Sequence, residues 1–144
     1  MINTKTIKMA SQIFINLPVS DLEASVQFFS YLGFEFNARF GDENTACMII
    51  ADNIFVMLLT EQRFSEFTDK PISDAHMQTE VLLSMDADSR EEVDEMVRRA
   101  VQAGGTLYAE AQDNGFMYHH SFADLDGHQW EVGYMDFSAL QKDQ

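Results

Sequence analysis

The sequence predicts an α+β fold made of two repeated βαβββ modules, and three observations lead to this prediction. Both halves of the chain open with a strand-like alternation of apolar and polar residues. In both halves a capping box and an apolar stripe at helical spacing follow. Three more strand-like segments then close each half. Because such a unit cannot bury its apolar face alone, the two modules must pack together, and a cleft for a small molecule forms where their sheets meet.

The first module spans about residues 12–60. Its opening strand is expected over Gln12–Val19, where alternate residues face opposite sides. Ser20 is the predicted N-cap of the following helix, with Glu23 completing the capping box, and Gly33 ends that helix. Turn residues then separate three predicted strands: Phe34–Phe40, Thr45–Ala51 and Ile54–Thr60.

The second module repeats this plan over about residues 80–136, and its first strand begins at Glu80. Ser89 with Glu92 forms the second capping box, and Gly104 stops the helix. The closing strands are expected at Thr106–Glu110, Phe116–Ala123 and His128–Met135, the last two joined by a tight turn at Asp124–Gly127.

Residues 61–79 lack both periodicities and are expected to connect the two modules. Phe64 and Phe67 indicate a short helical turn, which Pro71 ends. This connector is also a candidate lid over the cleft. The modules and their connector are expected to form a single domain over residues 12–136.

Composition excludes several classes of function. The formal net charge of −15 argues against binding to nucleic acid or to an anionic membrane surface, because both demand a basic face. No apolar run approaches the roughly 20 residues that a transmembrane helix needs. Cys47 is the only cysteine and cannot form an internal disulfide, so a buried, inert thiol in the cytoplasm is expected. The excess of carboxylates either serves solubility or steers a cationic ligand.

Two segments are the most specific motifs of the chain. One is Leu17–Phe29 followed by residues 32–34, and the other is Phe122–Val132. In this order and at this separation they resemble the vicinal oxygen chelate superfamily, which includes glyoxalases, bleomycin-resistance proteins and extradiol dioxygenases. The resemblance covers roughly residues 13–136. It implies that the two sheets pair into a cup with the helices outside, and that the protein is a homodimer.

In metal-binding members of that superfamily, four side chains face the cup and hold the metal. The resemblance places these positions at Phe14, Met57, Glu80 and Glu131. Two apolar side chains and two carboxylates therefore occupy them, whereas a transition-metal site usually includes imidazole or thiolate as well. Two alternatives are therefore left. The site holds a divalent metal such as zinc, nickel, manganese or iron, or the two carboxylates simply face water. An extradiol dioxygenase is disfavoured, because its iron site needs two histidines at these positions.

A histidine is a candidate third ligand. If Asp124 pairs with Gly127 in a tight hairpin, His120 lies opposite Glu131 on the same face of the sheet. A register shift of one residue would put His119 there instead. The alternative is that one of these adjacent histidines is buried, the other is exposed, and neither binds a metal.

Two functions follow from these residues. One of them, the alternative to the favoured function described below, is a metal-dependent lyase or isomerase of the glyoxalase type, as the resemblance implies. It would hold a divalent metal at Glu80, Glu131 and His120, with Glu131 as the catalytic carboxylate. Two carboxylates in one cleft would also raise the pKa of one of them, as a general acid or base requires. His76 and His128 are expected at the surface and take no part.

The favoured function is the binding of a small molecule without catalysis, as resemblance to bleomycin-resistance proteins implies. An acidic, partly apolar cup would sequester a small molecule, and a cationic compound that bears an aromatic ring is the expected ligand. The apolar side chains in two ligand positions and the net charge favour this function. The residues expected to contact the ligand are Phe14, Asn16, Met57, Tyr118 and His120.

Overall fold

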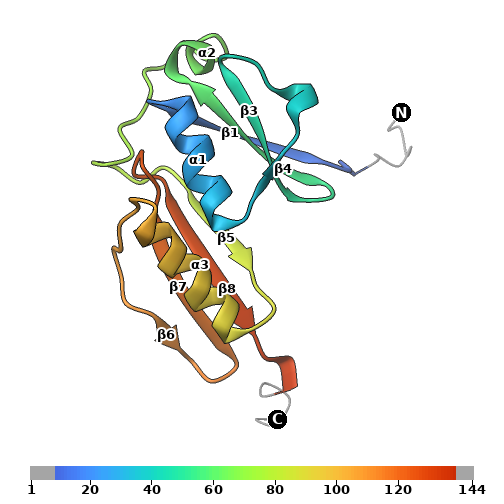
Figure 1. Ribbon diagram of the computed structural model, residues 1–144, viewed down its shortest axis with the longest axis vertical. Coiled ribbons are helices and arrows are strands. Elements are labelled where there is room, and N and C mark those ends of the chain that lie inside the picture. Colours follow the sequence, from blue (N-terminus) through green and yellow to red (C-terminus); the bar gives the residue numbers. More distant parts are fainter. Residues whose placement is uncertain (1–8, 139–144) are drawn as a thin grey trace, which may run out of the picture.

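The computed structural model describes residues 9–138, which form two four-stranded mixed sheets (Figure 1). The first sheet has the strand order β1-β4-β3-β2, with β1 at Ile13–Val19, β2 at Glu35–Phe36, β3 at Thr45–Ala51 and β4 at Ile54–Thr60. The second has the order β5-β8-β7-β6, with β5 at Leu82–Asp86, β6 at Gln112–Asp113, β7 at Met117–Ala123 and β8 at Gln129–Met135. In each sheet the first strand runs parallel to the last, and the other pairs are antiparallel. The predicted α+β fold of two βαβββ modules is confirmed.

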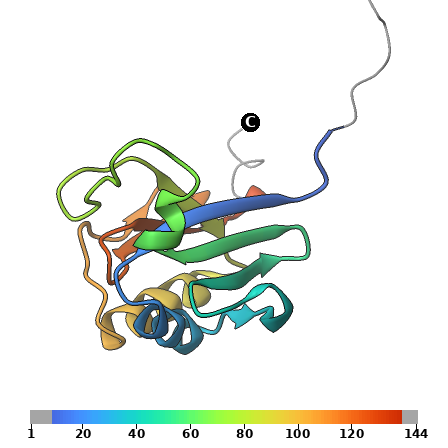
Figure 2. The ribbon, with the colours of Figure 1, turned by 90° about the horizontal axis from the view of Figure 1, so that it is seen from above.

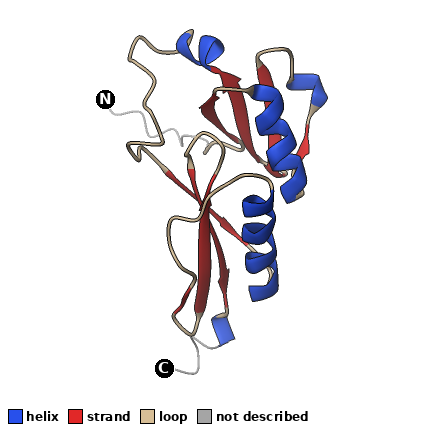
Figure 3. Cartoon of the chain, turned by 60° about the vertical axis from the view of Figure 1, so that its left-hand side comes forward, coloured by secondary structure: helices blue, strands red, loops and turns tan. Residues whose placement is uncertain are grey.

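Each module contributes one long helix, α1 at Leu22–Leu32 and α3 at Arg90–Gln102. Both helices lie on the same side of the two sheets, where they contact their strands and each other (Figures 2 and 3). A short helix, α2 at Glu61–Ser65, follows β4 directly and begins the connector. The apolar stripes predicted from the sequence are the buried faces of the long helices, with Phe28, Phe29 and Leu32 in α1 and Val93, Val97 and Ala100 in α3.

The two modules share one aromatic core. The indole of Trp130 on β8 lies 5.3 Å from the ring of Phe29 on α1 and 6.3 Å from the ring of Phe122 on β7. Phe28 of α1 also contacts Phe122, at 6.2 Å between ring centroids. Rings of this size bury much apolar area at such distances, so the core crosses the module boundary and holds the halves together.

The N-cap of α1 is Asp21, not Ser20 as predicted. The Asp21 carboxylate accepts a hydrogen bond from the Ala24 amide at 3.0 Å. The Ser20 amide instead donates to Asp126 Oδ1 of the second module, at 2.9 Å. Both residue types cap helices well, and the carboxylate also interacts favourably with the helix dipole. The predicted cap was therefore one residue too early, and the backbone of Ser20 contacts the other module.

Two predicted strands differ in the structure. The segment 34–40 is a strand only at Glu35–Phe36, because the side chain of Asn37 then caps a short 3-10 helix at Ala38–Phe40. The segment Thr106–Glu110 is irregular and meets β7 through one isolated bridge. Both segments lie at the edges of their sheets, where a strand can form hydrogen bonds with only one neighbouring strand.

The turn between β7 and β8 is organised by the buried carboxylate of Asp124. Its Oδ1 accepts the amides of Asp126 and His128, each at 3.0 Å, and its Oδ2 accepts the indole N–H of Trp130 at 3.0 Å. Burial raises the pKa of Asp124, while His128 and these hydrogen bonds oppose the rise. The amide of Asp124 donates to the carbonyl of His128, and Gly127 has a φ of 87°. The loop therefore has three residues rather than the two predicted.

The same turn joins the two modules. His128 is only 8% exposed, and its Nε2 lies 2.7 Å from the carbonyl oxygen of Pro18 at the end of β1. Together with the bond from Ser20 to Asp126, this contact fixes the end of β1 against the second sheet. The expectation of a surface position is therefore wrong for His128, and it is right for His76, which is exposed.

Cys47 lies on β3 and is 1% exposed, so the expected buried thiol is confirmed. Burial raises the pKa of this thiol, because the charged thiolate is poorly solvated there. Between residues 9 and 138, no helix is long and apolar enough to cross a membrane.

Asp124→Ala should lower the free energy of unfolding by about 2–5 kcal/mol, because it leaves three donors without their acceptor in a buried place. Asp52→Ala, in the exposed turn between β3 and β4, is the matched control and should change it by less than about 0.5 kcal/mol. Urea denaturation followed by circular dichroism measures both values. Equal losses in the two variants would contradict a special role for Asp124.

Candidate functional site

Each sheet has one face covered by α1 or α3 and one face turned away from them, which we call the open face (Figure 3). On the open face of the first sheet, Asn16 of β1 pairs with Met57 of β4. Phe14 stacks on Phe55, with 5.1 Å between ring centroids, and remains 49% exposed. The alternation of the sequence therefore predicted the shared face of these residues correctly.

One predicted correspondence between the modules is wrong. Superposing the two sheets on Met57 and Glu131 aligns β1 with β5. Phe14 then matches Leu82 rather than Glu80. Strand β5 begins only at Leu82, and Glu80 lies in the segment that leads into it. The prediction was two residues off because the alternation of the sequence extends beyond the hydrogen-bonded strand.

The predicted position of His120 opposite Glu131 is also wrong. Ser121 lies opposite Glu131, because the three-residue turn shifts the register of β7 against β8 by one residue. His120 thus belongs to the helix-covered face and lines a hollow beside residues 107–111. His119 takes its place on the open face, as the alternative register anticipated.

Tyr118 does not reach the open face either. It has the same parity as His120, and its hydroxyl donates to Asp94 of α3 at 2.5 Å. The guanidinium of Arg90 lies over its ring, 5.1 Å from the centroid. The bond to Asp94 raises the pKa of Tyr118. This side chain serves the packing of α3 on its sheet rather than the ligand contact expected from the sequence.

Glu131 lies in a hollow of about 360 Å³ on the open face of the second sheet, which Asp86 and His119 also line. The Glu131 carboxylate is half-buried and accepts a hydrogen bond from Ser84 Oγ at 3.2 Å. Burial raises the pKa of Tyr108 beside it, and the charge of Glu131 adds to this rise. Met85, Met117 and Met135 line the same hollow, so it is mainly apolar and carries two carboxylates and one imidazole.

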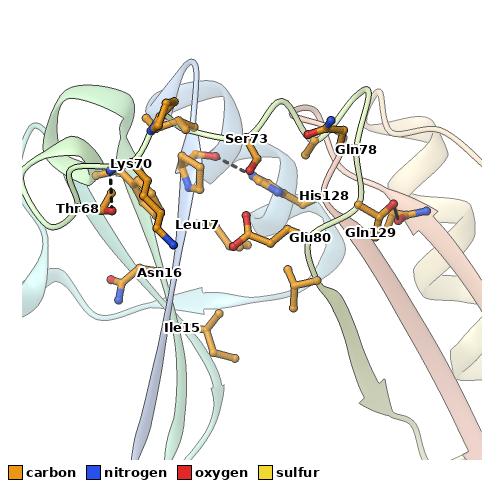
Figure 4. A pocket seen from close by; sticks show the side chains of 18 residues that line it. Ile15, Asn16, Leu17, Thr68, Lys70, Ser73, Gln78, Glu80, His128 and Gln129 are labelled. Atoms are coloured by element: carbon orange, nitrogen blue, oxygen red, sulfur yellow. Dashed lines mark hydrogen bonds between the residues drawn. The ribbon is translucent and has the colours of Figure 1, made fainter.

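A second cavity, of about 420 Å³, lies between β1, the connector and the start of the second module (Figure 4). We call it the connector cavity. The connector forms one of its walls, so the segment expected to cover a cleft does line a cavity. The apolar lining comes from both modules and from the connector, with Ile15, Leu17, Pro18, Phe64, Ile72 and Val81.

Polar side chains enter the connector cavity from three directions. Asn16 comes from β1, Lys70 from the connector and Glu80 from the segment before β5. The amine of Lys70 and the carboxylate of Glu80 both point into the cavity (Figure 4). Thr68 Oγ1 accepts the amide of Lys70 at 3.1 Å and shapes the connector there. Sequence reasoning missed Lys70, although it is the only lysine between residues 9 and 138.

Comparison with known proteins agrees with this architecture. Residues 12–51 match a family model described as bleomycin resistance protein-like N-terminal. A glyoxalase-related enzyme from Fulvimarina pelagi has 23% identity and a TM-score of 0.74, over 87% of this chain and 88% of that chain. The resemblance to the vicinal oxygen chelate superfamily is confirmed.

Two further structures are similar over almost their whole length. A hypothetical protein from S. aureus has 29% identity and a TM-score of 0.76, over 88% of this chain and 95% of that chain. A genomically encoded fosfomycin resistance protein from Listeria monocytogenes has 19% identity and a TM-score of 0.64, over 93% of this chain and 98% of that chain. No curated protein sequence matches the chain.

The side chains at the predicted metal positions do not fit a resident divalent metal. Glu80 lines the connector cavity, Glu131 lines the hollow on the second sheet, and His120 lines a third hollow. Over residues 9–138, no three side chains of histidine, cysteine, aspartate or glutamate converge on one point. Phe14 and Met57 supply no good metal ligand. We therefore derive no chemistry through a metal.

Zinc should bind weakly, and His120→Ala should not change that affinity, because His120 lies on the helix-covered face. His119→Ala is the matched variant, and any small loss should appear there, since His119 shares the hollow of Glu131. Calorimetric titration with zinc chloride of protein purified without a nickel column measures both effects. Tight, stoichiometric binding that His120→Ala abolishes would contradict this assignment.

Proposed function

We propose that this protein binds a small organic molecule in the connector cavity, without a resident metal. The observation that carries the proposal is the cavity itself. Its volume of about 420 Å³ falls within the range of roughly 300–1,000 Å³ found for small-molecule sites. Its walls are mainly apolar with a few convergent polar groups, which is the usual composition of such sites.

The resistance proteins among the similar structures and family models support a small molecule as the ligand. These names describe the other proteins and leave the ligand of this chain unspecified. The connector cavity holds Lys70 as well as Glu80, so it differs from the uniformly acidic cup that the net charge suggested. A purely cationic ligand would meet Lys70 unfavourably.

A glyoxalase-type lyase or isomerase is the second candidate, and one observation favours it. Glu131 and His119 share a hollow on the open face, where a carboxylate and an imidazole could exchange a proton with a substrate. In that case Glu131 would be the catalytic base, and the reaction would take place outside the connector cavity.

Two substitutions separate these candidates. Asn16→Phe should fill the connector cavity and weaken binding of benzyl alcohol at least about tenfold, from an affinity expected in the millimolar range. Ser84→Phe is the matched control, because Ser84 pairs with Glu131 as Asn16 pairs with Met57. It should leave this binding unchanged. Titration followed by shifts of the backbone amides provides the affinities.

The opposite ranking of these two variants would move the ligand to the hollow of Glu131 and favour the enzyme. Shifts confined to the amides of that hollow would lead to the same conclusion. Shifts confined to amides of β1 and the connector are the expected result.

We also propose a homodimer, as the superfamily resemblance implies. Large apolar side chains stay exposed on or beside the two outer strands, β1 and β5: Ile13 at 53%, Phe14 at 49%, Val81 at 41% and Leu82 at 52%. Outer strands and apolar patches of this kind are surfaces that association covers. A second copy, related by a two-fold axis, would cover both sets at once.

Sedimentation velocity should show a dimer at micromolar concentration, and Phe14→Glu should shift it toward monomer by placing a charge on the proposed interface. Phe40→Glu is the matched control, because Phe40 is 62% exposed on the 3-10 helix and outside both outer strands. A monomeric wild-type protein, or equal shifts in the two variants, would contradict the proposal.

A further inference from the structure

The connector cavity contains a lysine that forms no ion pair with any carboxylate of residues 9–138, in a chain of net charge −15. Arg63, Arg90, Arg98 and Arg99 each form an ion pair with a carboxylate. Lys70 forms none within the described part of the chain, although carboxylates are abundant. Its amine instead points into the cavity, above Asn16 (Figure 4).

Glu80 enters from the opposite wall. Its carboxylate points into the cavity toward the side of Lys70 (Figure 4). Among residues 9–138 it has no ion pair either. The cavity therefore holds two opposite charges that face each other across a gap and do not neutralise one another directly.

The walls between these two charges are apolar. Leu17 is buried, Ile15 and Ile72 are half-buried, and all three line the cavity. A ligand that fills this space would lie between the two charged groups (Figure 4). Lys70 and Glu80 are themselves exposed, so a ligand with one charge would pair with one group and leave the other in contact with water. A ligand with both charges would satisfy both.

We infer that the connector cavity takes a small zwitterion with an apolar body, which places a carboxylate at Lys70 and a protonated amine at Glu80. This inference rests on the proposed binding function and specifies its ligand class. Lys70 is the only lysine or arginine among the residues that line the cavity, and the chain is strongly negative. A singly charged carboxylate therefore suits the cavity better than a doubly charged phosphate. Asn16 supplies an amide beside the carboxylate end.

Four probes of nearly equal size test the inference: 4-(aminomethyl)benzoate, benzoate, benzylamine and benzyl alcohol. The zwitterion should bind about tenfold more tightly than either singly charged probe, because it adds one charge-assisted hydrogen bond to the one that the singly charged probe makes. Amide shifts of β1 and the connector measure the affinities and locate the site.

Variants assign each end of the ligand. Lys70→Met should reduce the affinity for the zwitterion to that for benzylamine, and Glu80→Gln should reduce it to that for benzoate. Neither should change the affinity for benzyl alcohol. The matched controls are Arg39→Met and Glu43→Gln, which change the same charges at exposed positions outside the cavity.

Three outcomes would overturn the inference. If benzyl alcohol binds in the cavity and the zwitterion gains nothing over it, the ligand class is wrong while the binding function stands. If the control variants lose as much affinity as Lys70→Met and Glu80→Gln, the effect is one of overall charge. If none of the four probes shifts an amide of the cavity, the proposed function fails as well.

Discussion

The arrangement of the second module depends on the hydrogen bonds that the carboxylate of Asp124 accepts. By accepting two backbone amides and the indole of Trp130, it fixes a three-residue turn and holds the largest core side chain in place. The turn sets the register of β7 against β8, and the register decides which side chains meet Glu131. It also presents His128 to the carbonyl of Pro18, so the same carboxylate orients one module on the other.

The two faces of the sheets differ in the side chains that they carry. The face under α1 and α3 contains the shared aromatic core, where Trp130, Phe29 and Phe122 pack across the module boundary. The opposite face and the outer strands carry exposed apolar and acidic side chains, which contribute little to the folding of one chain. The connector cavity lies at the junction, where neither sheet closes the space and an irregular segment completes the wall. Leu17 belongs to both regions, because it is part of the hydrophobic core and also lines the connector cavity.

Strand alternation and helix stripes were enough to predict the fold, and the bounds of β3 and β4 agree with the prediction residue for residue. They also placed Phe14, Asn16 and Met57 on one face. The register of β7 could not be predicted, because it depends on side-chain hydrogen bonds of Asp124 that the alternation pattern does not reveal. Lys70 was missed for a related reason: its position depends on the path of a segment without periodicity, which only tertiary contacts determine.

The connector both joins the two modules and lines the cavity, and this combination determines how the cavity can vary. Residues 61–79 connect the modules and also supply most of one side of the cavity. Their exposed side chains can change without disturbing the aromatic core, because loops tolerate substitution far better than packed elements do. Substitutions in the connector would therefore change one wall of the cavity, while the two modules keep the other walls. The two modules would then stay the same, and the connector would be the variable part of the cavity.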